Sequence, residues 1–391
     1  MKTKYLFTLI LIALILGAWA YKIARNREKT TPSVIGTRIF ADLPINDISK
    51  IIITRADATV DLAKVKGKWS VLNRYNYPAK FGKVVKTITE VADLKIGQVI
   101  TAPEADWGSF HLLSPKNIAS NHTKEAGSLL ELADKNGRIL ASLIIGKRFM
   151  RQPARQTPQM MAFGGYPDGQ YLRTGSNLFL AAKNLDRLKE DIPTWLDDKF
   201  INVPESNIKK IGVTGTGREP IELIRSEEGK ELQLRGIHEN EKPDTSEINR
   251  MANALHYFSF DDVASPALSH EKMGLDKGTF FVAHTFKNQI YRVQIGKKIS
   301  EENPSRYVKV NIEFNPPKQK ETTETKAEAL KIKDAEKEKN NEMTAEKTAK
   351  LTKSLNEKLS GWTYIVKSYR IEPLLTKREK LIKEEEKKKA K

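Results

Sequence analysis

One series of short sequence features occurs twice, in the same order, along this chain. Each copy has an Ile-rich segment, an alternating segment, a Gly-Lys turn, a helix-like segment, an Ile-Gly-Lys segment and a strand that begins with Tyr. The order predicts an internal duplication; the alternative is two unrelated α+β stretches. The matching segments are Pro44–Ile51 with Pro204–Ile211, Val60–Leu62 with Ile221–Leu223, Gly67–Lys68 with Gly229–Lys230, the helix around Ile88 with Ser246–Leu255, Val99 with Val263, Ile144–Lys147 with Gln294–Lys297, and Tyr171–Arg173 with Tyr307–Lys309.

Local patterns predict mostly short strands within these copies. Alternation of apolar and polar residues and β-branched content favour strands, whereas Val84, Val85, Ile88 and Val91 have helical spacing. A turn at 134–137 predicts a hairpin. We therefore expect an α+β fold of two similar β-rich lobes. The expected strands are 48–54, 59–62, 67–71, 129–133, 139–145, 171–173 and 362–366, with a further helix at 178–188.

The N-terminus contains an uncharged apolar run from Tyr5 to Tyr21, after a short basic leader. A membrane-spanning helix needs about 17–25 apolar residues, so this run predicts a single transmembrane anchor at residues 1–22. The alternative is a cleaved signal peptide, because Ala18-Trp19-Ala20 has the small residues of a cleavage site. The aromatic side chains at that site favour the uncleaved anchor.

Orientation rests on two opposing signals. The cations at 22–29 outnumber those before the run, and the positive-inside rule then favours a cytoplasmic C-terminal side. A basic leader, one apolar run and a long chain form the layout of an exported protein. We expect a protein of the cytoplasmic (inner) membrane whose bulk is extracytoplasmic or periplasmic.

The composition changes sharply near the C-terminus. Residues 318–350 are rich in Lys, Glu and Ala and contain no aromatic, which is typical of an exposed helix or a disordered linker. The expected organisation is a transmembrane anchor at 1–22, a tether at 23–43, a first α+β repeat at 44–203, a second at 204–317, the charged insert at 318–350, a helix and strand completing the second repeat at 351–375, and a charged tail at 376–391.

A known bacterial family has this order of features. The chain resembles the domain of unknown function 4340 family in its N-terminal anchor, Gly67-Lys68-Trp69, Gly274-Leu275-Asp276 and the closing Gly361-Trp362-Thr363-Tyr364. It departs from the pattern at 109–115, where Leu112-Leu113-Ser114 stands for Gly-Leu-Asp. The resemblance implies a membrane-tethered protein, often encoded near ABC-type export systems and gliding-motility-like auxiliary proteins. The family has no assigned catalytic residues to transfer.

The residues themselves give no catalytic signature. Cysteine is absent, and the six His form no paired metal spacing. His256 and His284 are interpreted as residues of the fold. Gly215–Arg218 lacks the Gly-Lys-Ser/Thr ending of a phosphate loop, and Gly164–Gly169 is interpreted as a loop that could bind a ligand. Asp197-Asp198 and Asp261-Asp262 are pairs of adjacent carboxylates. Adjacent residues of a strand point to opposite faces, so neither pair suits shared acid–base chemistry.

These observations leave a binding role as the leading expectation. We expect no enzyme activity, no catalytic, cofactor-binding or metal-binding residues and no cofactor. The net charge of +18 is spread along the chain without aromatic interleaving, so nucleic acid is not an expected partner. The expected function is a membrane-anchored extracytoplasmic binding or scaffold protein, with a protein partner in an envelope or ABC-type transport complex. The alternatives are an extracytoplasmic enzyme acting on envelope polymers and a purely structural envelope protein.

Overall fold

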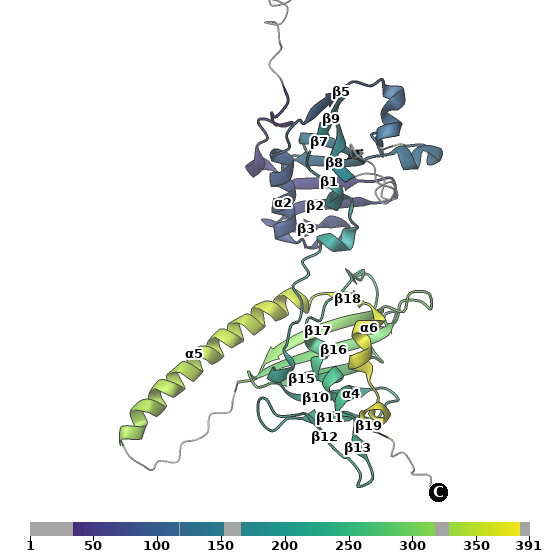
Figure 1. The fold of residues 1–391 in the computed structure, drawn as a ribbon. Helices are drawn as coiled ribbons and strands as arrows, with labels where there is room; N and C mark the ends of the chain where they lie inside the picture. The colour runs from purple at the N-terminus through teal and green to yellow at the C-terminus, as the bar shows by residue number, and fades with distance from the viewer. Residues whose placement is uncertain (1–33, 117, 152–165, 317–327, 384–391) are drawn as a thin grey trace, which may run out of the picture. The chain divides into compact units, whose positions relative to one another are not determined.

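The protein consists of two compact units. The structure, a computed structural model, describes residues 34–116, 118–151, 166–316 and 328–383 (Figure 1). Within these, unit 1 comprises residues 34–69 and 81–192, and unit 2 comprises Ser70–Lys80 and the chain from Pro193 onward. Both units contain large β-sheets and few helices, which confirms the mixed α and β class expected from the sequence.

The first sheet has nine strands in the order β4-β3-β2-β1-β6-β7-β8-β9-β5. The strand β1 pairs antiparallel with both β2 and β6, and alternate β1 residues such as Ile51 and Ile53 are buried while their neighbours are not. The strands are β1 (Lys50–Thr54), β2 (Thr59–Val65), β3 (Lys68–Val71), β4 (Tyr77–Pro78), β5 (Gln98–Ile100), β6 (Ser128–Ala133), β7 (Ile139–Arg151), β8 (Tyr166–Thr174) and β9 (Asn177–Ala181).

One amphipathic helix, α2 (Phe81–Ala92), contributes to the core of unit 1. Val84, Ile88 and Val91 are buried as their spacing predicts, whereas Val85 is exposed, because consecutive helical residues lie on different faces. Trp69 is also buried, as its place in an alternating strand predicts. The remaining helical segments of unit 1 are short 3-10 turns: η1 (Ile45–Asp47), η3 (Glu104–Phe110), η4 (Ser120–Glu125), η5 (Asp186–Lys189) and the start of η6 (Ile192–Trp195).

The predicted helix at 178–188 is wrong. Its first residues form the strand β9, which pairs with both β8 and β5, and only Asp186–Lys189 is helical, as one 3-10 turn. Leu178 and Ala181 are buried three residues apart, which is a spacing that also occurs on a helix face. Pairing on both sides of β9 therefore overrides an ambiguous local pattern.

The second sheet has eight strands in the order β12-β11-β10-β15-β16-β17-β18-β14. The C-terminal segment returns to unit 2 as a two-stranded sheet, β13 with β19, and Leu381 beside it is fully buried. The strands are β10 (Ile208–Gly215), β11 (Ile221–Ile224), β12 (Gln233–Leu234), β13 (Lys242–Pro243), β14 (Asp262–Val263), β15 (Thr279–Thr285), β16 (Gln289–Lys298), β17 (Arg306–Phe314), β18 (Thr363–Val366) and β19 (Ile382–Lys383).

The helices of unit 2 cap and connect these strands. Asp244 caps α4 by accepting hydrogen bonds from the amides of Ser246 and Glu247. The long helix α5 lies in sequence between the neighbouring strands β17 and β18, and it contacts β17, with Thr352 and Leu359 of its last turns buried. The helical segments are η2 (Leu72–Arg74), η7 (Glu205–Asn207), α4 (Thr245–Ala252), η8 (Asn253–Leu255), α5 (Glu328–Leu359), α6 (Ser368–Ile371), η9 (Glu372–Leu375) and η10 (Arg378–Leu381).

The two sheets have matching strand orders. From β3 onward the first sheet has the order β3-β2-β1-β6-β7-β8-β9-β5, and the second has the order β12-β11-β10-β15-β16-β17-β18-β14. In each order the first three strands precede the helix of that unit in sequence (α2 or α4), and the last, short edge strand (β5 or β14) follows it. A tight turn at His111 in unit 1 has its counterpart at Gly274 in unit 2, where φ is +57° and +65° respectively. In both turns the next Leu donates its amide to a carbonyl five residues earlier. The structural equivalent of Gly274-Leu275-Asp276 is therefore His111-Leu112-Leu113. The match of Leu112-Leu113-Ser114 with Gly-Leu-Asp made from the sequence is one residue out of register.

The expected anchor at 1–22 and most of the tether at 23–43 lie outside the described residues. In the part of the chain that the structure describes, no helix has both the length and the apolar character needed to cross a membrane.

Candidate functional site

A bulge in one long strand of each unit places a glycine carbonyl at the centre of a polar cluster. In unit 1 the pairing of β7 with β8 shifts between Ile145 and Arg148, beside Gly146. In unit 2 the pairing of β16 with β17 shifts between Ile295 and Lys298, beside Gly296. A bulge leaves backbone groups without ladder partners, and side chains can then bond to them.

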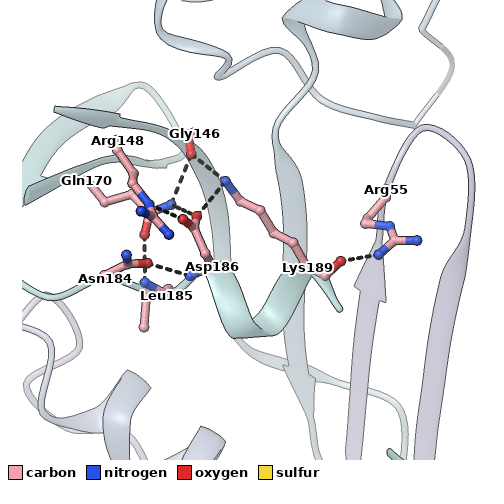
Figure 2. Close-up of polar contacts among 8 residues, drawn as sticks. All are labelled: Arg55, Gly146, Arg148, Gln170, Asn184, Leu185, Asp186 and Lys189. Carbon is pink, nitrogen blue, oxygen red and sulfur yellow. Dashed lines mark hydrogen bonds and ion pairs between the residues drawn. The ribbon is translucent and has the colours of Figure 1, made fainter. Parts of the chain in front are cut away.

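In unit 1 the Gly146 carbonyl binds two side chains from other elements. Gln170 on β8, fully buried, donates from Nε2 at 3.1 Å, and Lys189 of η5 donates from Nζ at 2.8 Å (Figure 2). Gln170 Oε1 also accepts the Leu185 amide at 2.7 Å. A single buried amide side chain thus holds the segment after β9 against the bulge.

The carboxylate of Asp186 neutralises the cations of this cluster. It accepts a hydrogen bond from Gln170 Nε2 at 2.8 Å, lies 3.0 Å from Lys189 Nζ and forms an ion pair with Arg148 (Figure 2). Burial alone would raise the pKa of Asp186, but hydrogen bonds from Lys189 and Arg148 more than offset it, and the pKa lies below its ordinary value. The unit 1 cluster therefore contains its own anion.

Arg55 fixes the far end of this segment. Its guanidinium donates to the Lys189 carbonyl (Figure 2). It also pairs with Asp191 at 2.8 Å and with Asp57 at 3.0 Å. Because Arg55 directly follows β1, it ties the turn η5 to the centre of the sheet.

Exchanging Asp186 for asparagine should destabilise unit 1 near neutral pH by about 1–2 kcal/mol, a charge-assisted bond discounted for partial exposure. The lowered pKa means that the carboxylate stabilises the fold above the unfolded-state value of about 4, and that this stabilisation is lost as pH falls through the folded-state pKa. The gap between variant and wild type should therefore close in acid. Urea unfolding at neutral and acidic pH measures it.

Asp93→Asn is the matched control, because Asp93 forms an ion pair with Arg38 in which both side chains are more than half exposed. Its effect should stay below about 0.5–1 kcal/mol. An Asp186 variant as stable as this control at neutral pH would contradict the role assigned to the carboxylate.

The equivalent place in unit 2 is an open cavity of about 570 Å³. The strand register identifies this place, because Gln170 lies opposite Arg148 in unit 1 and Arg306 lies opposite Lys298 in unit 2. Arg306 Nη1 donates to the Gly296 carbonyl at 2.9 Å, as Gln170 does to Gly146. The lining residues are Arg250, Lys298, Pro304, Arg306, Ser368, Ile371, Glu372, Leu375, Thr376, Lys377 and Lys380.

This basic cavity, as we call the space lined by those residues, has an excess of positive charge. Five of its side chains are cationic, and Glu372 is its one carboxylate. Arg250 pairs with Glu247 at 3.2 Å and Lys298 lies 3.9 Å from Glu301, both outside the lining. Burial lowers the pKa of Arg306.

Glu372 corresponds to Asp186 in chain order but not in contacts. Buried Ile371 and Leu374 follow β18 as buried Leu185 and Leu188 follow β9, so Glu372 has the place of Asp186. Glu372 is exposed, and among the described residues its carboxylate forms no ion pair, nor do the ammonium groups of Lys377 and Lys380. Within the described residues, Glu372 therefore pairs with no cation of the basic cavity, whereas Asp186 pairs with both Arg148 and Lys189 in unit 1.

A second, smaller cavity of about 90 Å³ adjoins the C-terminal segment, and the glycine turn considered from the sequence lies there. It is lined by Gly217, Arg218, Glu219, Lys377, Arg378 and Glu379. Arg218 donates to the Thr376 carbonyl at 2.5 Å, and Arg378 pairs with Glu219 at 3.0 Å. The turn after β10 thus holds the C-terminal segment in place.

The adjacent carboxylates have separate partners. Asp197 pairs with Lys358 at 2.8 Å and Asp198 with Lys80, while Asp261 pairs with Arg370 at 2.9 Å and Asp262 with Arg74 at 2.7 Å. Within each pair, the two carboxylates therefore have different cationic partners and do not converge on a common point.

The remaining residues weighed from the sequence have local roles. His256 stacks on Tyr257, and His284 on β15 has a pKa lowered by burial. Of the predicted loop 164–169, residues 166–169 belong to β8 and the others lie outside the described residues. Among the described residues, no group of three or more His, Asp or Glu is placed to hold a metal ion.

Sequence reasoning missed both polar clusters. The matched segments Tyr171–Arg173 and Tyr307–Lys309 are immediately preceded by Gln170 and Arg306, so the repeat did contain the pair. Nothing in the sequence indicated that both side chains reach a bulge carbonyl.

The fold is thus that of a protein with two units, each with a mainly antiparallel sheet, in which the two sheets have matching strand orders. The family model described as domain of unknown function (DUF4340) matches residues 69–278, more than half of the chain. The chain belongs to this family, which confirms the resemblance seen in the sequence. No curated protein and no solved structure matches the chain.

Proposed function

We propose that this protein is a membrane-anchored, non-catalytic extracytoplasmic binding or scaffold protein that serves an ABC-type transport system. The bulk of the chain lies on the periplasmic side of the cytoplasmic membrane, and a protein of the transport or envelope complex is its partner. The uncharged run Tyr5–Tyr21 and the association implied by the family support the anchor and the partner.

The observation that carries the binding role is the difference between the equivalent polar clusters. In unit 1 Asp186 lies beside the bulge and pairs with Arg148 and Lys189. In unit 2 the same place is a cavity whose volume lies within the usual range of small-molecule sites, about 300–1,000 Å³. One unit is thus closed by its own charges, and the other is open to a ligand.

The two units arose, in this proposal, by duplication of one ancestral unit. Matching strand orders, the equivalent turns at His111 and Gly274, and the equivalent bulges at Gly146 and Gly296 support it. After duplication one copy keeps a structural polar cluster while the other is free to change its ligand.

Anchoring and orientation are tested on the full chain with alkaline phosphatase fused after Lys391. The fusion protein should stay in the membrane pellet after alkaline carbonate extraction and should be enzymatically active, because the phosphatase works only after export. A fusion lacking residues 1–22 should be inactive and soluble. An intact but inactive full-length fusion, or a mature N-terminus at Tyr21, would contradict the anchored extracytoplasmic protein.

The partner is tested by crosslinking the tagged full chain in cells and purifying it from membranes. An ABC-type permease should be enriched over an unrelated single-pass protein with the same tag. Equal recovery in both samples would reject the transport role. Turnover of an isolated envelope polymer by the purified chain would reject the non-catalytic proposal and favour an enzyme.

A further inference from the structure

The basic cavity of unit 2 contains cationic groups from four separate places in the chain. Arg250 is on α4, Lys298 ends β16, Arg306 begins β17, and Lys377 and Lys380 follow η9. Cationic side chains that only face solvent need not come together from distant parts of the chain. Here the cations line one concave space of about 570 Å³, where their fields add.

Arg306 is the least exposed cation of the cavity, and its position is fixed. One guanidinium nitrogen is held at 2.9 Å from the Gly296 carbonyl, and the residue is half-buried. The fork of a guanidinium has five N–H donors, so most remain available beside the cavity. Fixed forks of this kind bind phosphate oxygens in pairs.

Lys377 and Lys380 add positive charge at the rim. Both are exposed, and within the described residues neither ammonium group has an ion pair. Ser368 and Thr376 also line the cavity, but their hydroxyl groups already donate to the carbonyls of Pro304 and Pro373. One fixed guanidinium and two ammonium groups without ion pairs suit a compact anion with several oxygens.

We propose that the basic cavity binds a phosphate-bearing group, which occupies in unit 2 the place that the Asp186 carboxylate occupies in unit 1. This inference rests on the binding role proposed above and names its ligand chemistry. A phosphate monoester has a charge of about −1.5 to −2 at neutral pH, which suits three cations that form no ion pair among the described residues better than a single carboxylate does.

The test titrates the full chain in detergent with two probes at constant ionic strength. Inorganic phosphate represents free phosphate, and glycerol 3-phosphate represents a lipid headgroup. Calorimetry should show saturable one-site binding of at least one probe, and the tighter probe identifies the source. Acetate at equal ionic strength should bind at least about tenfold more weakly, because it lacks the second charge.

The first variant is Arg306→Gln, which introduces the side chain that unit 1 has at the equivalent place. The fold should persist, because Gln170 makes the corresponding hydrogen bond to Gly146. Phosphate affinity should fall about tenfold or more, the effect of losing a charge-assisted contact. The double variant Lys377→Gln/Lys380→Gln should weaken binding to a similar degree.

The matched control is Lys272→Gln/Lys277→Gln, which removes the same charge from exposed lysines of unit 2 outside the cavity. Its affinity should stay within about twofold of wild type. No saturable binding of either probe, or equal losses in cavity and control variants, would overturn the proposal. If the chain still captures its permease while no phosphate binds, this inference fails and the proposed function stands. If phosphate binds and no permease is enriched, the cavity binds its ligand as inferred and the transport role is rejected.

Discussion

Replacing Tyr364 with alanine should destabilise unit 2 by about 3–5 kcal/mol, the usual cost of deleting a large buried aromatic side chain. Tyr364 on β18 is fully buried, and its ring lies 4.5 Å from that of Phe200 and 4.9 Å from that of Phe260, centroid to centroid. Tyr77, also in unit 2, meets it edge-on at 6.3 Å. Urea unfolding followed by tryptophan fluorescence measures the change, since Trp362 contacts the same cluster.

Two further variants serve as controls. One removes only the hydroxyl group of Tyr364 and keeps its ring, and the other removes a tyrosine that is not buried. Tyr364→Phe loses the hydrogen bond to the Leu359 carbonyl, 3.2 Å long, and should cost only about 1 kcal/mol. Tyr369→Ala removes a side chain that is 60% exposed and should change stability by about 0.5 kcal/mol or less. Similar losses in Tyr364→Ala and Tyr369→Ala would mean that the aromatic cluster does not hold unit 2 together.

Gly296→Ala should destabilise unit 2 by about 1–3 kcal/mol or more, because an added methyl group has no room. A Cβ at this bulge would lie 2.3 Å from the Met273 carbonyl oxygen, which itself accepts the Lys297 amide at 3.0 Å. Backbone on both sides would have to separate. The loop before β15 would be displaced, and the unfolding transition of unit 2 should move to lower urea concentration.

Gly212→Ala is the control for the loss of glycine itself. Gly212 lies in β10, where an added Cβ meets nothing within 4 Å. Alanine there should be neutral or stabilising by up to about 1 kcal/mol, because it restricts the unfolded chain. If Gly296→Ala unfolds no more readily than Gly212→Ala, the close packing of the loop on the bulge is wrong.

Much of the fold could be predicted because strand signals are local. The hairpin of β6 and β7, the strands β2 and β18 and the burial of Tyr364 all follow from alternation and turn residues. The strand β9 could not be predicted, because its pairing with β5 and β8 is decided by segments far away in the chain. The predicted charged tail was also incomplete: Leu381 is buried and Ile382–Lys383 pairs with β13, a contact between distant segments.

The candidate site was still harder to predict. The charge excess of the basic cavity depends on Arg250, Arg306 and Lys377, which are separated by long stretches of sequence. Each is an ordinary surface-type residue in its local context. Asp186 and Glu372 both carry a carboxylate in matching chain order, so the difference between them that matters here lies in their contacts. Only the fold distinguishes the paired carboxylate from the unpaired one.

The position of α5 has a consequence for how proteins with this fold can vary. In unit 1 the strands β8 and β9 are joined by a tight turn at Gly175, whereas β17 and β18 are joined by the connection that contains α5. The entropy lost on closing a loop grows only logarithmically, by about 0.6 kcal/mol for each doubling of length. A hairpin tip can therefore gain or lose dozens of residues at a cost of about 3 kcal/mol, which is less than the stability of an ordinary domain, about 5–15 kcal/mol. Relatives of this chain can differ greatly in length at this point while keeping the register of every strand around it.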